Sequence, residues 1–231
     1  MDNLKIYYEK LYHSQDEILN LLVKSECYLY LTGGTALHRF VLENGTRYSD
    51  DIDLFTADRS IGGKDEIANF VNFLKENKID FNIIVDTPSF KRLIIKKSGL
   101  KVDLAHDTLE HIGKFNKHKN GFLFDNIDNI LLNKYDAVFS REQSRDLFDI
   151  YTIIKNSNID LLDSFDNFQN KSLNSPEIIC ARIKSFPSNL IDINDIRAKD
   201  EKYLKDFIKN YQQTFFEYFD IENKAKKLKN K

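Results

Sequence analysis

The segment YLTGGTALHRFVLENGTRYSDDIDLF, residues 30–55, decides the fold that this 231-residue sequence predicts. Residues 27–32 form a short aromatic and apolar run, which predicts a buried strand that ends at Gly33 and Gly34. Residues 35–42 predict a helix directly after the glycines, and residues 51–55 predict a second strand. The segment therefore predicts a strand, a glycine turn, a helix and a strand in close succession.

Three aspartates crowd the start of the second predicted strand, at positions 50, 51 and 53. Side chains two residues apart on a strand point to the same face, so Asp51 and Asp53 project together while Ile52 points into the core. Close carboxylates repel each other unless a cation lies between them, and oxygen ligands of this kind are those that Mg²⁺ prefers. We therefore predict a divalent-cation site at Asp51 and Asp53, and a solvated position for Asp50 at the strand edge.

A third carboxylate is expected from a neighbouring strand. Asp103 lies in the strand-like run 100–107, where it shares a face with Lys101 and Ala105. Asp86 is the alternative, but it ends a strand-like run just before a proline, where an aspartate commonly caps a turn. We favour Asp103 as the third carboxylate.

The glycine turn offers a second part of an active site. A strand that ends in Gly33 and Gly34 and opens a helix leaves backbone N–H groups at the helix start, a position suited to phosphate. Phosphate binding beside a metal site with two carboxylates is the equipment of nucleotidyl and phosphoryl transfer. The structural alternative is a solvated acidic strand end, because an Asp-x-Asp pair alone is typical of both.

The rest of the chain predicts an α/β domain followed by a helical domain. Residues 1–26 have helical spacing, with a capping box at Ser14 and Glu17, and residues 64–77 predict an amphipathic helix. Strand-like runs cover residues 80–86, 90–97 and 100–107, and the last two predict a hairpin. From residue 126 the spacing is helical, and the chain ends in a basic segment at 224–231. We predict domains over residues 1–124 and 125–231.

Composition bears on partners and location. The net charge of −2 gives no basic field over the whole molecule that would attract nucleic acid. The two cysteines lie far apart in the sequence and near no histidine cluster, so we expect two reduced, buried thiols. No apolar run reaches the roughly 20 residues of a membrane span, and the N-terminus is too polar for a signal peptide. We expect a cytoplasmic protein without membrane contact. One local basic patch is a candidate site for an RNA or nucleotide phosphate, namely Lys91, Arg92, Lys96, Lys97 and Lys101.

The sequence resembles a known family in two places. The segments GGTAL (33–37) and RYSDDIDLF (47–55) resemble the nucleotidyltransferase signature of the AbiEii/AbiGii toxin family, within the DNA polymerase β-like nucleotidyltransferase superfamily. The segment RDLFDIY (145–151), with Lys134 and Arg141 before it, is similar to a later lysine and Arg-Asp-x-x-Asp segment of that family. The resemblance covers residues 28–155. It implies an α+β fold, in which a nucleotidyltransferase-fold mixed sheet flanked by helices precedes a C-terminal helical bundle.

The resemblance also implies roles for individual residues. The implied catalytic residues, which also bind the metal, are Asp51, Asp53 and Asp103; Asp103 would help to activate the attacking hydroxyl. The implied nucleotide-binding residues are Gly33, Gly34, Thr35, Ser49, Lys134 and Asp146. Lys134 would contact the triphosphate, and Asp146 would shape the nucleotide site from the helical domain. The serine that many superfamily members have after the glycine is Thr35 here, which keeps the hydroxyl.

Structural alternatives remain for several of these residues. Ser49, with Arg47, is also suited to fixing the loop that presents Asp51. Lys134 is also compatible with the surface of an amphipathic helix, and Asp146 with an exposed charge pair. For His38 and Arg39, which follow the glycines, we predict an exposed helix face.

The leading functional hypothesis is a magnesium- or manganese-dependent nucleotidyltransferase. It would transfer a nucleoside monophosphate from an NTP to an acceptor hydroxyl, with RNA such as tRNA as a candidate acceptor. The resemblance implies a toxin of a bacterial toxin–antitoxin or abortive-infection system, and therefore a cognate antitoxin protein. Two alternatives are a non-catalytic nucleotide- or partner-binding module of the same fold, and a nucleotidyltransferase acting on small molecules of the antibiotic type.

Overall fold

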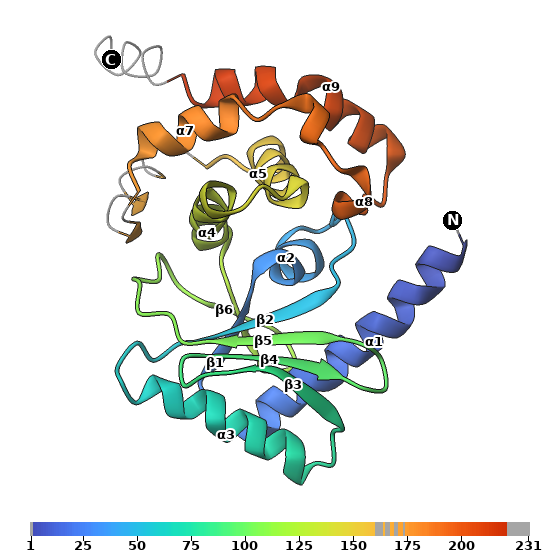
Figure 1. Cartoon of the computed structure of the whole chain (residues 1–231), viewed down its shortest axis with the longest axis vertical. Coiled ribbons are helices and arrows are strands. Elements are labelled where there is room, and N and C mark those ends of the chain that lie inside the picture. Colours follow the sequence, from blue (N-terminus) through green and yellow to red (C-terminus); the bar gives the residue numbers. More distant parts are fainter. Residues whose placement is uncertain (1, 160–163, 165–166, 169–170, 173, 221–231) are drawn as a thin grey trace. The chain divides into compact units, whose positions relative to one another are not determined.

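The computed structural model describes residues 2–159, 164, 167–168, 171–172 and 174–220. The chain divides into two compact units, Met1–Ile130 and Leu131–Lys231, and each is described here by itself (Figure 1). The basic segment predicted at 224–231 lies outside the described residues. Within the part of the chain that is described, no helix combines the length and the low polarity needed to cross a bilayer.

The first unit is built on a mixed sheet, which has seven strands among the described residues and the order β3-β4-β5-β2-β1-β7-β6. The strands are β1 (Leu29–Thr32), β2 (Asp51–Thr56), β3 (Phe81–Asp86), β4 (Phe90–Ile95), β5 (Lys101–Ala105), β6 (Asn116–Lys117) and β7 (Leu123–Phe124). Strand β2 pairs antiparallel with β1 and parallel with β5, so β2 lies inside the sheet. The predicted hairpin is confirmed, because β4 pairs antiparallel with β5. The two short strands β6 and β7 were not predicted.

Strand alternation fixes which side chains enter the core. Ile52 and Leu54 of β2 are fully buried, as are Val102 and Leu104 of β5. Asp51 and Asp53 of β2 are only partly buried, whereas Asp103 of β5 is buried. The face carrying the apolar residues therefore forms the core of this unit, and the opposite face of β2 and β5 carries the acidic side chains.

The helices of the first unit begin with α1 (Asp2–Ser25), which contacts α3 (Gly63–Glu76). In Figure 1, α3 and the short α2 (Gly33–Ala36) lie on opposite sides of the strands, and both contact β2. The helix predicted at 35–42 is α2 followed by the π-helical turn η1 (Leu37–Val41). The capping box predicted at Ser14 is wrong, because α1 runs through it unbroken and the Ser14 hydroxyl lies 2.8 Å from that of Ser98.

The second unit is helical throughout its described residues. Its elements are α4 (Ile127–Ser140), which begins at the end of the first unit, α5 (Ser144–Asn156), α7 (Pro176–Lys184), the 3₁₀ turn η2 (Ser188–Leu190), α8 (Ile193–Ile196) and α9 (Glu201–Tyr218). Buried aromatic rings fill its core, with Phe148 and Tyr151 of α5 packed edge-on against Phe207 of α9. The predicted α+β fold, a mixed sheet flanked by helices and followed by a helical region, is confirmed.

Candidate functional site

Three carboxylates meet on one face of β2 and β5. The parallel register places Asp53 opposite Asp103 and Asp51 opposite Lys101, and residues opposite each other on neighbouring strands point to the same side. We call Asp51, Asp53 and Asp103 the acidic row. Strand β3, which carries the alternative Asp86, lies at the far edge of the sheet, and Asp86 pairs there with Lys91. The structure thus brings Asp103, and not Asp86, beside Asp53.

Two basic side chains neutralise part of this acidic row. Arg92 of β4 donates from Nε to Oδ1 of Asp103 at 2.8 Å and from Nη2 to Oδ2 at 2.7 Å. Lys101 Nζ lies 2.6 Å from Asp51 Oδ2 and 3.8 Å from Asp103 Oδ2. Arg92 therefore engages both oxygens of Asp103, which is the strongest geometry for an arginine and a carboxylate.

The acidic row suits a hard divalent cation at two of its three members. Asp51 and Asp53 are alternate residues of one strand, and two carboxylates together with phosphate oxygens are a usual magnesium site. Asp103 differs, because the Arg92 fork occupies both of its oxygens. Among the described residues, no three histidine, cysteine or acidic side chains lie close enough together to hold a metal ion as they stand. Asp51 and Asp53 would hold the cation, and Asp103 would join them only when Arg92 moves.

Gly33 brings the chain directly against Asp53. Its φ of +71° is in the left-handed region, and a Cβ at this position would overlap the Asp53 carboxylate. Gly34 is equally confined, since its Cβ would overlap the Arg47 guanidinium. Gly33 therefore lets the backbone after β1 lie against Asp53, and Gly34 lets it lie against Arg47.

Replacing Gly33 by alanine is expected to destabilise the protein by about 2–4 kcal/mol, from backbone strain and from displacement of Asp53. Gly99 is a matched control, because its φ is +70° but a Cβ there meets nothing within 4 Å. Gly99→Ala should show the strain alone, about 1–2 kcal/mol. Urea unfolding of both variants measures the difference, and equal losses would show that contact with Asp53 contributes nothing.

Thr35, Ser49 and Arg47 brace the loop before β2. Thr35 Oγ1 lies 2.9 Å from Ser49 Oγ and within hydrogen-bond distance of the Asp51 carbonyl. All three residues are buried, Thr35 completely. The resemblance implies that Thr35 and Ser49 bind the nucleotide, and in this structure both hydroxyls are buried and contact the loop. They fix the backbone that presents Asp51, as the alternative for Ser49 and Arg47 proposed.

Helix α1 supplies three residues to this loop that the sequence did not point to. Gln15 is fully buried, and its Nε2 donates to the carbonyls of Ser49 and Asp51 at 3.1 and 3.3 Å. The Tyr12 hydroxyl accepts a hydrogen bond from the backbone N–H of Ser49, and the Tyr8 hydroxyl donates to Asp50 Oδ1 at 2.6 Å. A sequence signal existed, because Gln15 occupies a position of the apolar stripe of α1, where a polar side chain requires a buried partner.

Two further predictions near this loop need correction. Asp50 is not simply solvated, because it is partly buried and accepts the hydrogen bond from Tyr8. His38 and Arg39 do not lie on an exposed face, since His38 is 2% exposed and Arg39 donates to Gln15 Oε1 at 2.7 Å and to Asp16 at 2.6 Å. For Asp50 and Arg39 the physical reason is α1, whose side chains bond to both, and a contact with a distant helix cannot be predicted from local periodicity.

The basic patch predicted on β4 and β5 is largely neutralised by local pairing. Besides Arg92 and Lys101, Lys91 pairs with Asp86, and Lys96 pairs with Asp80 at 2.7 Å. Each of these cations therefore has a carboxylate partner on its own or a neighbouring segment. The hairpin is mixed in charge, and it gives no support to a continuous phosphate-binding groove.

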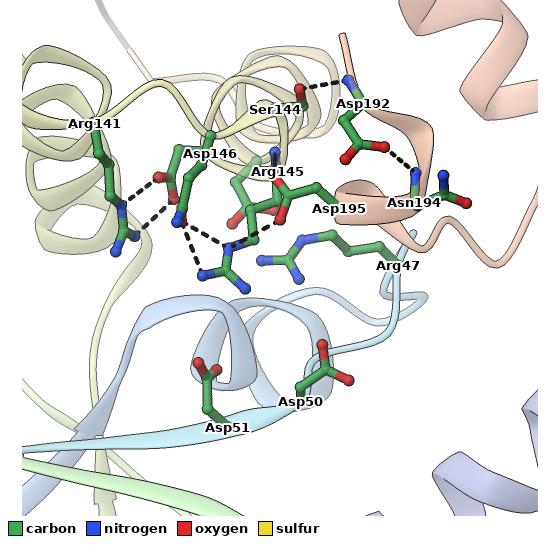
Figure 2. A network of polar contacts seen from close by, with 12 residues as sticks. Arg47, Asp50, Asp51, Arg141, Ser144, Arg145, Asp146, Asp192, Asn194 and Asp195 are labelled. Carbon is green, nitrogen blue, oxygen red and sulfur yellow. Dashed lines mark hydrogen bonds and ion pairs between the residues drawn. The ribbon is translucent and has the colours of Figure 1, made fainter. Parts of the chain in front are cut away.

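The second unit holds the other two residues implied for the nucleotide site. Lys134 of α4 lies 2.8 Å from Asp146 Oδ1 and 2.7 Å from Asp149 Oδ2, and both carboxylates are fully buried. Arg141 also holds Asp146, as Figure 2 shows, with Nε 2.8 Å from Oδ2 and Nη2 3.2 Å from Oδ1. Lys134 is therefore no surface lysine, and Asp146 is no exposed pair with Arg145. We call these four residues the internal ion-pair cluster.

Electrostatics in the internal ion-pair cluster favour ionised Asp146. Burial alone would raise the pKa of this carboxyl, but the charge of Lys134 and the hydrogen bonds and charge of Arg141 outweigh it and leave the pKa lowered. Arg141 is the outward member, with its side chain 48% exposed against 8% for Lys134. Of the two cations in this cluster, Arg141 is therefore the more accessible to a molecule from solvent.

The segment that contains the acidic row matches a known protein family. Residues 18–117 match the family model described as "Nucleotidyl transferase AbiEii toxin, Type IV TA system". This match confirms over those residues the family predicted from the sequence, which is a family of nucleotidyltransferases. No curated protein sequence matches the chain.

The chain is also similar to solved structures. The crystal structure of JHP933 from Helicobacter pylori is similar with a TM-score of 0.50 and 18% identity, over 96% of this chain and 97% of that chain. MenT4, the nucleotidyltransferase toxin Rv2826c from Mycobacterium tuberculosis H37Rv, has a TM-score of 0.49 and 14% identity, over 90% of this chain and 93% of that chain. The first similarity supports a shared fold along nearly the whole chain.

Proposed function

We propose that this chain, whose residues 18–117 match the nucleotidyl transferase AbiEii toxin family, transfers a nucleoside monophosphate from an NTP to an acceptor hydroxyl with Mg²⁺ or Mn²⁺. The observation that carries the proposal is the contact between the glycine turn and the acidic row. Gly33, which has no side chain, lies directly against Asp53, and Asp53 lies opposite Asp103. This arrangement suits a triphosphate whose phosphates lie along the turn while its metal lies on the carboxylates.

Each residue of the acidic row has a proposed part in the transfer. Asp51 and Asp53 hold the divalent cation, which supplies neutralising charge for the triphosphate and the departing pyrophosphate. In the reaction the acceptor oxygen forms a bond to the α-phosphorus, the bond from that phosphorus to the pyrophosphate oxygen breaks, and the hydroxyl proton leaves the acceptor. Asp103 is the proposed first receiver of that proton, at the Oδ atoms that Arg92 occupies in this structure. The backbone of Gly33 and Gly34 holds the phosphates.

The finer assignments follow the family. We propose a toxin of a toxin–antitoxin pair, with a cognate antitoxin protein, RNA such as tRNA as the acceptor and the NTP-containing cytoplasm as the location. The roles that the resemblance implies for Lys134 and Asp146 in nucleotide binding remain part of the proposal. Within the second unit the ammonium of Lys134 already pairs with two carboxylates, which suits it to holding Asp146 and Asp149 in place.

The test is label transfer by the full chain. Each of the four NTPs, labelled at the α-phosphate, is incubated with total cellular RNA, purified tRNA or an aminoglycoside panel, with Mg²⁺, with Mn²⁺ or with EDTA. We expect labelled RNA with metal and none with EDTA. Label on the aminoglycosides alone would replace the RNA acceptor by a small-molecule one.

Binding measurements identify the non-catalytic alternative. Calorimetry with each NTP, with and without Mg²⁺, reports whether the chain binds nucleotide at all. Metal-dependent NTP binding without transfer to any acceptor in the panel would contradict the enzymatic proposal and favour a nucleotide-binding module.

A further inference from the structure

The acidic row is held by two cations that belong to the chain itself. Asp51, Asp53 and Asp103 together carry three negative charges, and Arg92 and Lys101 supply two positive ones within 2.6–2.8 Å of the carboxylates that they contact. Lys101 also lies 3.8 Å from Asp103, so it links the two ends of the row. Without these side chains the three carboxylates would repel one another on a partly buried face.

A divalent cation, Arg92 and Lys101 cannot all bind the acidic row at once without repelling one another. The row with both side chains has a net charge of −1, and adding a divalent cation without moving either side chain would make it positive. At separations of a few ångströms near a protein surface, a divalent cation and a positively charged side chain repel each other strongly. Entry of a metal is therefore coupled to the displacement of Arg92, Lys101 or both.

We propose that Arg92 competes with the divalent cation for Asp103 and so sets the cation affinity of the acidic row. The inference rests on the proposed function, because that function supplies the cation. In the metal-free protein Arg92 and Lys101 stabilise the row. When a cation binds, Arg92 releases Asp103, which then becomes the third carboxylate of the site and regains the capacity to accept a proton.

Arg92 is better suited to this control than Lys101. Its guanidinium is permanently charged and takes both oxygens of Asp103, whereas the flexible ammonium of Lys101 makes one short contact. Its side chain is 37% exposed, which leaves room for it to move away from the carboxylate. In the same position its guanidinium lies 5.5 Å from the centre of the Phe90 ring, a contact on its own strand that does not involve Asp103.

The electrostatics of Arg92 extend over the whole acidic row. The pKa of its guanidinium is raised, first by the hydrogen bonds to Asp103 and then, against a smaller lowering by burial, by the charges of Asp103, Asp53 and Asp51. All three carboxylates thus contribute to holding this one side chain. A cation that binds the row must therefore compete with Arg92 for these carboxylates.

Calorimetric titration of the full chain with Mn²⁺, in the absence of nucleotide, tests the proposal. Arg92→Gln is expected to bind Mn²⁺ at least about tenfold more tightly than the wild type, because a competing charge is gone and Asp103 is released. Asp103→Asn in the Arg92→Gln background should remove most of the gain. Lys91→Gln is the matched control, since it removes the same charge from the preceding residue of β4, on the opposite face.

A second measurement separates competition from a merely structural role. In EDTA, Arg92→Gln should melt at a lower temperature than the wild type, and saturating Mn²⁺ should restore the lost stability. If Arg92→Gln fails to fold, Arg92→Lys replaces it, since lysine keeps the charge but not the two-pronged contact. Arg92→Lys should still bind Mn²⁺ more tightly than the wild type, by less than the roughly tenfold gain expected for Arg92→Gln. Unchanged or weaker Mn²⁺ binding by Arg92→Gln, or no Mn²⁺ binding by any of these proteins at millimolar concentration, overturns the proposal.

The outcome is independent of the transfer assay. A tighter Mn²⁺ site in Arg92→Gln together with absent label transfer would leave this inference standing and contradict the proposed function. Label transfer by the wild type with no change in Mn²⁺ affinity in Arg92→Gln would do the reverse.

Discussion

Asp53→Asn is expected to reduce nucleotidyl transfer by about 10³-fold or more, which corresponds to about 4 kcal/mol of transition-state stabilisation. Asparagine keeps the shape of the side chain and one oxygen, but it removes the charge that holds a divalent cation against the triphosphate. Asp53 lies opposite Asp103 and against Gly33, so no other carboxylate of the row occupies the same position. The rate of label transfer under saturating NTP and Mg²⁺ measures the effect.

Asp50→Asn is the matched control for that loss. It removes an equal charge three residues earlier, at a position where the carboxylate accepts a hydrogen bond from the Tyr8 hydroxyl, and the asparagine oxygen can accept the same bond. Its transfer rate should stay within about threefold of the wild type. Asp53→Asn with a rate within tenfold of the wild type, or equal losses in both variants, would show that Asp53 does not hold the metal.

Lys134→Met is expected to lower the free energy of unfolding by about 3–5 kcal/mol at pH 7. The ammonium lies 2.8 Å and 2.7 Å from two carboxylates that have no exposed surface. Methionine fills a similar volume, but it leaves Asp146 and Asp149 buried without this charge, and an uncompensated buried charge is among the most destabilising defects. Urea unfolding followed by circular dichroism measures the loss.

The stability lost in Lys134→Met should depend on pH. Because the pKa of Asp146 is lowered in the folded protein, its contribution to stability is present above the unfolded pKa, near 3.9, and is lost as the pH falls through the folded value. Without Lys134 that lowering weakens, and protonation of the carboxyl relieves the defect. The difference in stability between Lys134→Met and the wild type should therefore shrink from pH 7 to pH 4.

Lys205→Met provides the comparison for a lysine in an exposed pair. Lys205 pairs with Glu201 one helical turn away, and both side chains are about three-quarters exposed. Such pairs contribute little because solvent screens them, so this variant should unfold almost as the wild type does. A loss in Lys134→Met no larger than that in Lys205→Met would contradict the buried cluster as a source of stability.

Local patterns predicted the parts of the fold that depend on local physics. The alternation of Asp51, Ile52 and Asp53 sets the two faces of β2 wherever that strand lies, and Ile52 is buried as expected. The hairpin of β4 and β5 followed from a turn between two apolar runs. Strands β6 and β7 are only two residues long, so they contain too few residues for a periodic pattern and were missed.

The interactions around the site depend on partners distant in the sequence. The pairing of Arg92 with Asp103 requires the register of the hairpin, and a slip of one residue would send the two side chains to opposite faces. Gln15 reaches Ser49 and Asp51 only because α1 packs against their loop. Likewise Lys134 has the sequence context of a surface residue, and only the packing of α5 beside α4 makes it internal. The role of each residue in nucleotide transfer stays a prediction.

The parallel pairing of β2 with β5 has a consequence for the newly made chain. Parallel neighbours need a long crossover, and here α3 and the strands β3 and β4 are made before β5 can reach β2. A ribosome-bound chain that has completed the signature at residues 33–55 therefore carries Asp51 and Asp53 but neither the third carboxylate nor the cations Arg92 and Lys101. Truncated products that end before residue 100 would keep the recognisable motif without a complete acidic row. For the proposed nucleotidyl transfer, synthesis would thus precede activity by the length of that crossover.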